Sequence, residues 1–234
     1  MTNNNDNNSN SAIVKRGPIS WLILLFAILV SKIFIKFKVS GLDKLPNCGS
    51  YIIAANHLSY FDGLWIMASL PISKIKKFHT IAGSDLWTDY GILGRIMMRV
   101  GSAIPLDRKG SPISGILSAK RALISDNILL IHPEGTRSHD GYLARPIHGG
   151  AALLSRRAQV PLVPVYLDGA YEIFGRHQKF PKVFKSFFRR RELIIRIMDG
   201  LDPKDYHNSR EMTEKLENEL HNCDMNRITE SSRN

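Results

Sequence analysis

The sequence predicts an α/β protein: a single domain with a central, mostly parallel or mixed sheet flanked by helices, plus an N-terminal membrane-associated helix. Three observations lead to this fold class. The 234 residues fit one domain, because a single core rarely grows beyond about 250 residues. Short apolar runs alternate with helical patterns along most of the chain, as in sheets covered by helices. A separate apolar run with basic flanks precedes this alternation.

The alternation defines the expected elements of the body. Strands are expected at residues 33–39, 50–55, 78–82, 102–106, 128–132, 162–167 and 193–198. Helices are expected at residues 61–69, 86–99, 112–125 and 149–158. Neither an internal repeat nor a Gly/Ser-rich linker interrupts this pattern, so the body, residues 38–222, is expected to fold as one unit.

The N-terminal end divides into two segments. Residues 1–17 begin with an Asn-rich polar tract that has nothing to bury, so a disordered tail is expected. Residues 18–37 hold the apolar run, whose uninterrupted part, 19–30, is shorter than the roughly 20 residues of a spanning helix. We interpret this segment as a membrane-anchoring helix that lies in the interface, with lysines at the headgroups. A buried core helix and a single span over 21–37 remain alternatives.

The C-terminal end is expected to be helical and then irregular. Met212, Leu216 and Leu220 are spaced four apart, which places them on one helical face. With Ser209 as a suitable cap, a packing helix is predicted for residues 208–222. The polar residues 223–234 are expected to fray as a tail.

Charge and cysteine usage limit the class of function. The chain has 32 Lys and Arg against 21 Asp and Glu, a net charge of +11. This balance favours an acidic partner such as nucleic acid, an anionic membrane surface or a phosphorylated substrate. The two cysteines, Cys48 and Cys223, lie far apart and lack metal-ligand spacing. A disulfide scaffold and a cysteine-based zinc site are therefore excluded, and a reducing compartment is expected.

His57 and Asp62 follow an apolar strand and form the first candidate site. Five residues turn a regular helix by about 500°, which would leave the two side chains about 140° apart. They meet only if His57 lies in the loop after the strand and Asp62 in the first helical turn, for which Ser59 is a plausible N-cap. Asp62 would then hold one imidazole nitrogen and leave the other as a base. Taken alone, a surface histidine near a capping aspartate is the simpler interpretation.

A second polar cluster, Glu134-Gly135-Thr136-Arg137, follows the apolar run 128–131. Glycine allows the backbone to approach a ligand closely, and arginine offers a planar fork that matches a phosphate group. Glu134 can orient the guanidinium or a substrate hydroxyl. The alternative is a polar turn with an ion pair. Arg108 also follows a short strand, where a surface ion pair is the simplest interpretation.

Two prolines, Pro161 and Pro164, flank a short apolar run. Proline is confined to sheet edges, strand starts and bulges, so these residues are expected to shape a sheet margin or an opening. A wall for an apolar ligand is the functional alternative.

In this order, the four clusters resemble the sequence blocks of the glycerophospholipid acyltransferase superfamily, and most closely the 1-acylglycerol-3-phosphate acyltransferases. Asn56, His57 and Asp62 match its Asn-His-x4-Asp block. Residues 133–138 match its Phe-Pro-Glu-Gly-Thr-Arg-Ser block, with His132 in place of the usual phenylalanine. Residues 101–108 are similar to the second block, and 160–165 match the fourth. The resemblance covers about residues 38–170.

One block departs from the family pattern. The second block usually opens with a Lys-x-Glu-Leu-like segment, whereas residues 83–86 read Gly-Ser-Asp-Leu. Because acceptor and donor preference in this family vary around such positions, the departure bears on the substrate more than on the reaction.

The resemblance implies an O-acyltransferase. A fatty acyl group would pass from a thioester, acyl-CoA or acyl-carrier protein, to the sn-2 hydroxyl of 1-acylglycerol 3-phosphate (lysophosphatidic acid), giving phosphatidic acid. His57 would be the general base, and Asp62 would orient it. Since a thioester is already activated, no Ser or Cys acyl-enzyme is needed. The donor is a co-substrate, and no cofactor is expected. The sequence shows no metal-ligand cluster, so no metal is expected either.

The remaining site residues are implied in the same way. Arg137 and Arg108 would hold the acceptor phosphate, and Glu134, Gly135 and Thr136 would shape that pocket. We expect a membrane-associated protein that contacts membrane lipids, with its active site on the cytoplasmic face of the cell membrane.

Other functions remain as alternatives. The acceptor can be another lyso-lipid, such as lyso-ornithine lipid or a different lysophospholipid, or glycerol 3-phosphate. A hydrolase would use Ser59 as nucleophile, but the sequence lacks a Gly-x-Ser-x-Gly elbow there. A non-enzymatic module would bind anionic membranes or nucleic acid through the basic, aromatic segment 174–196. Beside lipid-handling motifs, a membrane surface suits that segment better, so no nucleic-acid partner is expected.

Overall fold

A seven-stranded mixed sheet forms the centre of the protein. The computed structural model describes residues 13–47, 49–86, 91–106, 113–186 and 189–231. Each of the seven apolar runs predicted as strands is a strand of this sheet: β1 (Lys36–Ser40), β2 (Tyr51–Ala55), β3 (Phe78–Gly83), β4 (Ile104–Leu106), β5 (Ile128–Ile131), β6 (Leu162–Asp168) and β9 (Glu192–Ile197). Their order is β1-β9-β6-β2-β5-β3-β4.

All neighbouring strands of this sheet run parallel except β6 and β9, which are antiparallel. Every residue of β2 is buried, as expected for a central strand of a sheet that is covered on both faces. The prediction of a mostly parallel or mixed sheet is confirmed. Because β6, β2 and β5 are adjacent and parallel, the loops that follow them meet at one edge.

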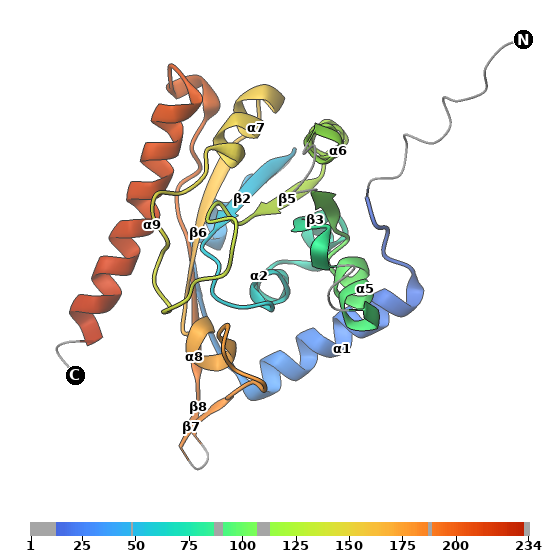
Figure 1. Cartoon of the computed structure of the whole chain (residues 1–234), viewed down its shortest axis with the longest axis vertical. Coiled ribbons are helices and arrows are strands. Elements are labelled where there is room, and N and C mark those ends of the chain that lie inside the picture. The colour runs from blue at the N-terminus through green and yellow to red at the C-terminus, as the bar shows by residue number, and fades with distance from the viewer. Residues whose placement is uncertain (1–12, 48, 87–90, 107–112, 187–188, 232–234) are drawn as a thin grey trace, which may run out of the picture.

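Helices cover both faces of the sheet (Figure 1). One core lies between the sheet and the pair α1 (Pro18–Phe34) and α2 (Asp62–Ser69). The other lies under α6 (Ile113–Ile124), α7 (Gly150–Ala158) and α9 (Ser209–Ser231). Side chains of β2 alternate between these cores, with Ile53 in the first and Ile52 in the second. The predicted helices at 61–69, 112–125 and 149–158 are confirmed.

The helix predicted at 86–99 corresponds to α5 (Gly91–Val100), and residues 87–90 lie outside the described part of the chain. The sequence pattern missed two short helices, α3 (Ile72–Lys76) and α8 (Ala170–Phe174). Each has only five residues, too few for an apolar face to repeat.

The N-terminal segment contacts the body of the protein already at Val14, before the expected end of the tail at residue 17. Residues 13–17, assigned to a disordered tail, are ordered by contacts: the Val14 N–H donates to the Ala103 carbonyl. Arg16 donates to the carbonyl oxygens of residues 75, 78 and 100 at 2.6–2.7 Å. Residues 1–12 of that tail lie outside the described residues. Helix α1 ends at Phe34, before residue 37, because the chain then pairs with β9 as β1.

Helix α1 is amphipathic in its packing. Leu24 is buried in the first core. On the opposite face, five large apolar side chains form an exposed stripe, with 53–73% of their surface accessible: Ile19, Leu22, Phe26, Leu29 and Ile33. Within the described residues, each helix is either too short or too polar to cross a membrane. Of residues 21–37, the alternative single span, only 21–34 are helical.

Helix α9 is longer than predicted. Met212, Leu216 and Leu220 are fully buried in the second core, as their spacing predicted. The helix continues to Ser231 instead of fraying after residue 222. Asp224 and Arg227 explain the difference, because both form hydrogen bonds to the body of the protein. Residues 232–234 lie outside the described part.

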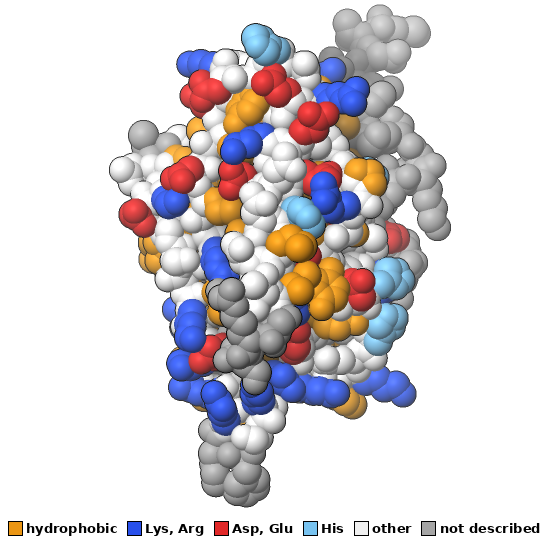
Figure 2. All heavy atoms as spheres, turned by 90° about the vertical axis from the view of Figure 1, so that its left-hand side faces the viewer, with side chains coloured by type: hydrophobic (Ala, Val, Ile, Leu, Met, Phe, Trp, Pro, Cys, Tyr) orange, Lys and Arg blue, Asp and Glu red, His pale blue; other side chains and the backbone are white. Residues whose placement is uncertain are grey.

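A small hairpin lies within the basic segment 174–196. Strands β7 (Phe184–Ser186) and β8 (Arg189–Arg190) pair antiparallel, and all their described residues are exposed. The view onto α9 shows Lys and Arg gathering toward the lower end of the molecule, where the hairpin lies (Figure 2). Arg190 donates to the Ile33 carbonyl at 2.8 Å, which joins the hairpin to the end of α1.

Pro164 corrects one expectation. It lies inside β6, between β9 and β2, so it does not mark a sheet margin. It lies where the pairing is irregular: Leu162 bridges Leu201, whereas Val165 already pairs with Ile197. A bulge tolerates proline because a ladder hydrogen bond is already missing there. Pro161 precedes β6, in agreement with a strand start.

Candidate active site

The candidate site lies at the carboxyl ends of β2 and β5. Asn56 and His57 directly follow β2, and His132 directly follows β5. Ligands of open α/β sheets commonly bind at this edge. Asn56 fastens the site to the next strand, because its side-chain amide exchanges two hydrogen bonds, of 2.9 and 2.7 Å, with the backbone of Leu167.

His57 and Asp62 meet as the sequence required. His57 lies in the loop after β2, and Asp62 is the first residue of α2. His57 Nδ1 lies 2.9 Å from Asp62 Oδ2. Because a carboxylate only accepts, this contact places the proton of a neutral His57 on Nδ1 and leaves Nε2 as the basic nitrogen.

Asp62 is completely buried and held by the loop that carries His57. Its Oδ2 also accepts the N–H groups of Leu58 and Ser59 at 2.7 and 2.8 Å. Burial nevertheless raises the pKa of Asp62 to about 6. Burial therefore makes the ionised form of Asp62 energetically unfavourable. A positive charge on the His57 ring offsets this cost by electrostatic attraction.

Ser59 does not act as the N-cap of α2. The cap position is Phe61, and Ser59 Oγ accepts the Phe61 N–H at 3.1 Å in the turn before the helix. The Asp62 carboxylate bonds back to the N–H groups of Leu58 and Ser59, which precede the helix, and no side chain caps the first turn of α2. Ser59 is also fully buried, which disfavours its use as an exposed nucleophile.

His132 stacks on His57. The two ring centroids lie 3.9 Å apart, and the planes differ by 9°. His132 Nδ1 donates to the carbonyl oxygens of Ala55 and Asn56 at 2.9 and 3.1 Å. Burial, with a further contribution from His57, lowers the pKa of His132 to about 3, so the ring stays neutral. The sequence showed His132 only as a substitution for phenylalanine, and the structure gives it a flat, neutral surface against His57.

Glu134 holds the backbone around the site through both of its carboxylate oxygens. Its Oε1 accepts the His57 N–H at 2.6 Å, and its Oε2 accepts the Ala144 N–H at 2.9 Å. The predicted contact with a guanidinium or a substrate hydroxyl is therefore replaced by two backbone contacts. Glu134 is 5% exposed, and this burial raises its pKa to about 7.

Two arginines lie together at the open side of the site. The Arg137 guanidinium lies 3.4 Å from the ring centroid of Tyr60, which fixes its plane by a cation–π contact. Arg176 donates to Thr136 Oγ1 at 3.3 Å and to the Arg137 carbonyl at 3.2 Å. Sequence reasoning placed Arg176 in the basic segment 174–196 and missed its return to this loop.

Gly135 permits the tight turn before these residues. Its φ of 71° lies in the left-handed region. A Cβ on Gly135 would also lie 3.0 Å from a ring carbon of His148. The positive φ therefore favours glycine at this point, and a Cβ there would also force the His148 ring to shift.

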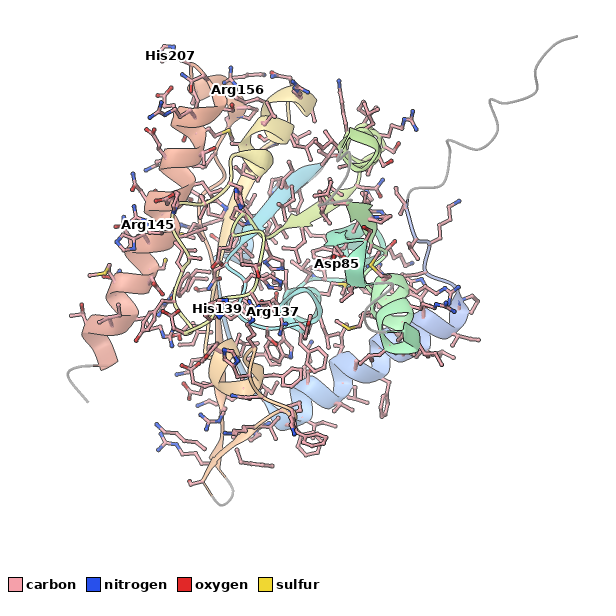
Figure 3. The ribbon with its side chains drawn as sticks, viewed as in Figure 1. Asp85, Arg137, His139, Arg145, Arg156 and His207 are labelled. Atoms are coloured by element: carbon pink, nitrogen blue, oxygen red, sulfur yellow. The ribbon has the colours of Figure 1, made fainter. Side chains whose placement is uncertain are left out.

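A cavity of about 520 Å³ opens between the site and the helices α1, α2 and α5. His57, His132, Thr136, Arg137 and Arg176 line its polar end, whereas Glu134 does not line it. Figure 3 shows two polar lining residues from different loops, Arg137 from the loop after β5 and Asp85 from the segment after β3. The rest of the wall is mainly apolar and includes Ile23, Ala27, Phe61, Leu64, Leu93, Ile96 and Met97.

His57, Asp62 and His132 are also close enough to be considered as a metal-binding group, with one possible ligand atom each within 4.8 Å of the others. Imidazole lone pairs lie in the ring plane. Because the two rings are nearly parallel at 3.9 Å, their lone pairs do not converge on one point, and a shared ion would require the rings to turn. That no metal is required stays a prediction.

The structure does not place every predicted residue. Arg108 and residue 107 lie outside the described residues, as does Cys48. His57, Asp62, Gly135, Thr136 and Arg137 come together as predicted. The missed members are His132, Arg176 and the backbone role of Glu134.

Comparison with known proteins agrees with these motifs. A family model described as Acyltransferase matches residues 36–168, more than half of the chain. The chain belongs to the acyltransferase family. The match covers β1 to β6 and thus the loops that carry His57 and Arg137.

The curated relatives of this chain point to one group. The mouse (Mus musculus) protein named 1-acyl-sn-glycerol-3-phosphate acyltransferase alpha is 30% identical over 149 residues, which is 62% of this chain and 50% of the relative. A Streptococcus pneumoniae protein named 1-acyl-sn-glycerol-3-phosphate acyltransferase is 31% identical over 135 residues, which is 57% of this chain and 47% of the relative. The chain spans about half the length of the curated relatives it matches.

A solved structure supports the fold. The crystal structure of the 1-acyl-sn-glycerophosphate (LPA) acyltransferase PlsC from Thermotoga maritima superimposes with a TM-score of 0.67. The superposition covers 86% of this chain and 78% of the other, at 21% identity. The seven-stranded sheet with helices on both faces is therefore an architecture already known in an acyltransferase.

Proposed function

We propose that the protein transfers a fatty acyl group from a thioester to the sn-2 hydroxyl of 1-acylglycerol 3-phosphate, producing phosphatidic acid and a free thiol. One observation carries the proposal: a histidine oriented by a buried aspartate lies at the junction of a cationic site and an apolar cavity. These are the three parts that the reaction needs, namely a base, a phosphate site and a place for acyl chains. The names of the curated relatives agree with this acceptor.

In this proposal His57 is the general base. Nε2 removes the proton from the acceptor hydroxyl as its oxygen attacks the thioester carbonyl carbon. The carbon–sulfur bond then breaks, and the proton on the imidazolium passes to the leaving sulfur, which gives the free thiol. Asp62 keeps Nδ1 protonated and stabilises the positive ring, a contribution that grows as the transition state develops.

Arg137 and Arg176 are proposed to bind the acceptor phosphate. Their guanidinium groups offer fork-shaped donors, and both line the cavity beside His57. The contact between Arg176 and the Arg137 carbonyl holds Arg176 against the loop that carries Arg137, so one phosphate can meet both side chains. Arg108, predicted from the sequence, stays a third candidate.

The apolar end of the cavity is proposed to hold the acyl chains of the substrates. Ile23 and Ala27 of α1 form part of its wall, while other α1 residues present the exposed apolar stripe to the outside. One helix therefore borders both the cavity and the outer surface. We propose that α1 lies in a membrane interface, from which lipid substrates reach the cavity, and that the cationic hairpin β7–β8 faces anionic headgroups.

Vesicle binding tests the membrane part of the proposal. Phe26→Glu places a charge in the exposed stripe, so binding to vesicles of phosphatidylcholine and phosphatidylglycerol should weaken at least tenfold. Ile124→Glu changes an equally exposed apolar residue on α6, 72% against 68% accessible, and serves as control. Equal binding by the two variants would contradict a docking role for α1.

Product analysis tests the reaction itself. The purified full-length protein in detergent is incubated with lysophosphatidic acid and either acyl-CoA or acyl-carrier protein as donor. We expect phosphatidic acid to form in step with free thiol with at least one donor. A lack of turnover with both donors and with a panel of lyso-lipid acceptors would refute the enzyme and favour the binding module.

A further inference from the structure

Helix α9 holds the loop that follows Arg137. Residues 138–149 form neither a regular helix nor a strand before α7 begins. Two carboxylates of α9 accept backbone N–H groups of this loop: Asp224 Oδ2 from Leu143 at 3.2 Å, and Glu217 Oε2 from Ile147 at 3.0 Å. Glu217 Oε1 also accepts from Arg145 Nε at 2.6 Å, and Figure 3 shows Arg145 beside α9.

The same loop reaches the proposed base. Ala144, which lies between the two held positions, donates its N–H to Glu134 Oε2 at 2.9 Å. The other Glu134 oxygen accepts the His57 N–H at 2.6 Å. The loop also contacts His57 directly, because the Ser138 N–H donates to the His57 carbonyl at 2.7 Å. A continuous set of hydrogen bonds thus leads from α9 to the backbone of His57.

Helix α9, from which this set of hydrogen bonds starts, is itself packed firmly against the sheet. Met212, Leu216 and Leu220 are fully buried, and the Tyr166 hydroxyl of β6 donates to Asp224 Oδ1 at 2.6 Å. Arg227 adds an ion pair with Asp168 at 3.0 Å. Because β6 is the neighbour of β2, α9 and His57 are fixed to adjacent strands.

We propose that α9 positions the active site: Glu217 and Asp224 hold the loop 138–149 so that Ala144 fixes Glu134, and Glu134 fixes the backbone of His57. The family match ends at residue 168, so Glu217 and Asp224 lie outside the matched region. The effect on turnover rests on the proposed function, whereas the effect on the loop does not.

Glu217 is the better residue for the test, because its side chain is 15% exposed whereas Asp224 is buried with two partners. Although burial opposes it, the contacts with Ile147 and Arg145 lower the pKa of Glu217, so the side chain is a carboxylate at neutral pH. Glu217→Ala removes both contacts, and Glu217→Gln keeps an oxygen that can accept the Ile147 N–H. Glu214→Ala is the matched control, since Glu214 lies on the same helix, is 62% exposed and forms an ion pair with Arg210 one turn earlier on α9.

Amide hydrogen exchange and steady-state kinetics are measured on the full-length variants. We expect Glu217→Ala to raise exchange at least fivefold in peptides covering residues 139–148 and 56–60, with β6 unchanged. We expect kcat to fall about tenfold while the KM for the thioester stays within twofold. Glu217→Gln should recover most of both losses, and Glu214→Ala should match the wild type.

Two results would overturn the proposal. Unchanged exchange at residues 56–60 in Glu217→Ala would show that the loop does not hold His57. Faster exchange with an unchanged kcat would show that the holding has no catalytic consequence. If the wild type shows no turnover, the proposed function fails, while the exchange at residues 56–60 still decides whether α9 fixes His57.

Discussion

Replacing Asp62 by asparagine separates the charge of the dyad from its shape. All three donors that contact Asp62, namely His57 Nδ1 and the N–H groups of Leu58 and Ser59, meet the same oxygen, Oδ2. An asparagine oxygen at that place can accept all three, so the loop and the His57 tautomer are kept. What Asp62→Asn removes is the negative charge opposite the imidazolium of the transition state.

The size of the loss follows from the 2.9 Å contact in a buried setting. Two unit charges about 4 Å apart interact by about 4 kcal/mol at the effective dielectric constant of roughly 20 that suits protein sites. His57 is partly accessible, so we expect about 3–4 kcal/mol, which lowers kcat roughly 10²–10³-fold. Initial rates of thiol release at saturating substrates measure it, with Asp43→Asn as an exposed control.

The Asp62 charge should affect stability and activity in opposite directions: it raises kcat but lowers the free energy of unfolding near neutral pH. Because the pKa of Asp62 is raised to about 6 from 3.8, the folded state binds the proton more tightly than the unfolded state. The resulting stabilisation is present at low pH and is lost as the pH rises from about 4 through about 6. Relative to Asp62→Asn, the wild type should therefore lose about 2 kcal/mol of unfolding free energy between pH 4 and pH 7.

Denaturant unfolding at the two pH values, followed by circular dichroism, gives this difference. A variant that loses stability at pH 7 together with activity would refute the reasoning, because the loss would then come from a disrupted loop. A variant with wild-type kcat would refute the role of the charge.

Three further predictions concern the surroundings of the dyad. Arg176→Gln should raise the KM for lysophosphatidic acid about tenfold and leave that for the thioester unchanged, whereas the exposed Arg157→Gln should change neither; equal shifts in both constants would contradict a phosphate contact. Gly135→Ala should lower the unfolding free energy by about 1–3 kcal/mol, because its φ is positive and its neighbour is close; a neutral effect in denaturant unfolding would contradict this. Arg16→Met should cost about 3 kcal/mol by leaving three carbonyl oxygens without a donor, and a Tm equal to that of Lys15→Met would disprove it.

The fold was largely predictable because its strands are short apolar runs at the centre of a covered sheet. Strand β2 shows this best: all five residues are buried, so the sequence reads as uninterrupted apolar character. The ends were less predictable. Arg16 orders residues that the composition assigned to a tail, and Asp224 and Arg227 extend α9 beyond its apolar face. Such single long-range contacts leave no periodic signal in the sequence.

The site divides in the same way. His57 and Asp62 are five residues apart, so local geometry was enough to state the condition under which they meet. His132 and Arg176 reach the site from segments 75 or more residues away from His57, and only the tertiary structure brings them there. The motif also suggested that Glu134 points at a ligand, whereas its oxygens hold the backbone of residues 57 and 144.

The most direct test of the central claim compares chemistry with binding at His57. Free-thiol release from palmitoyl-CoA or an acyl-carrier protein donor is measured with 1-oleoyl-lysophosphatidic acid for the wild type and for His57→Ala, and the Kd for the acceptor is measured for both. If His57 is the base, kcat falls at least about 10²-fold while the acceptor Kd stays within twofold. Turnover by the variant at the wild-type rate, or loss of acceptor binding in proportion to the loss of kcat, would contradict the assignment.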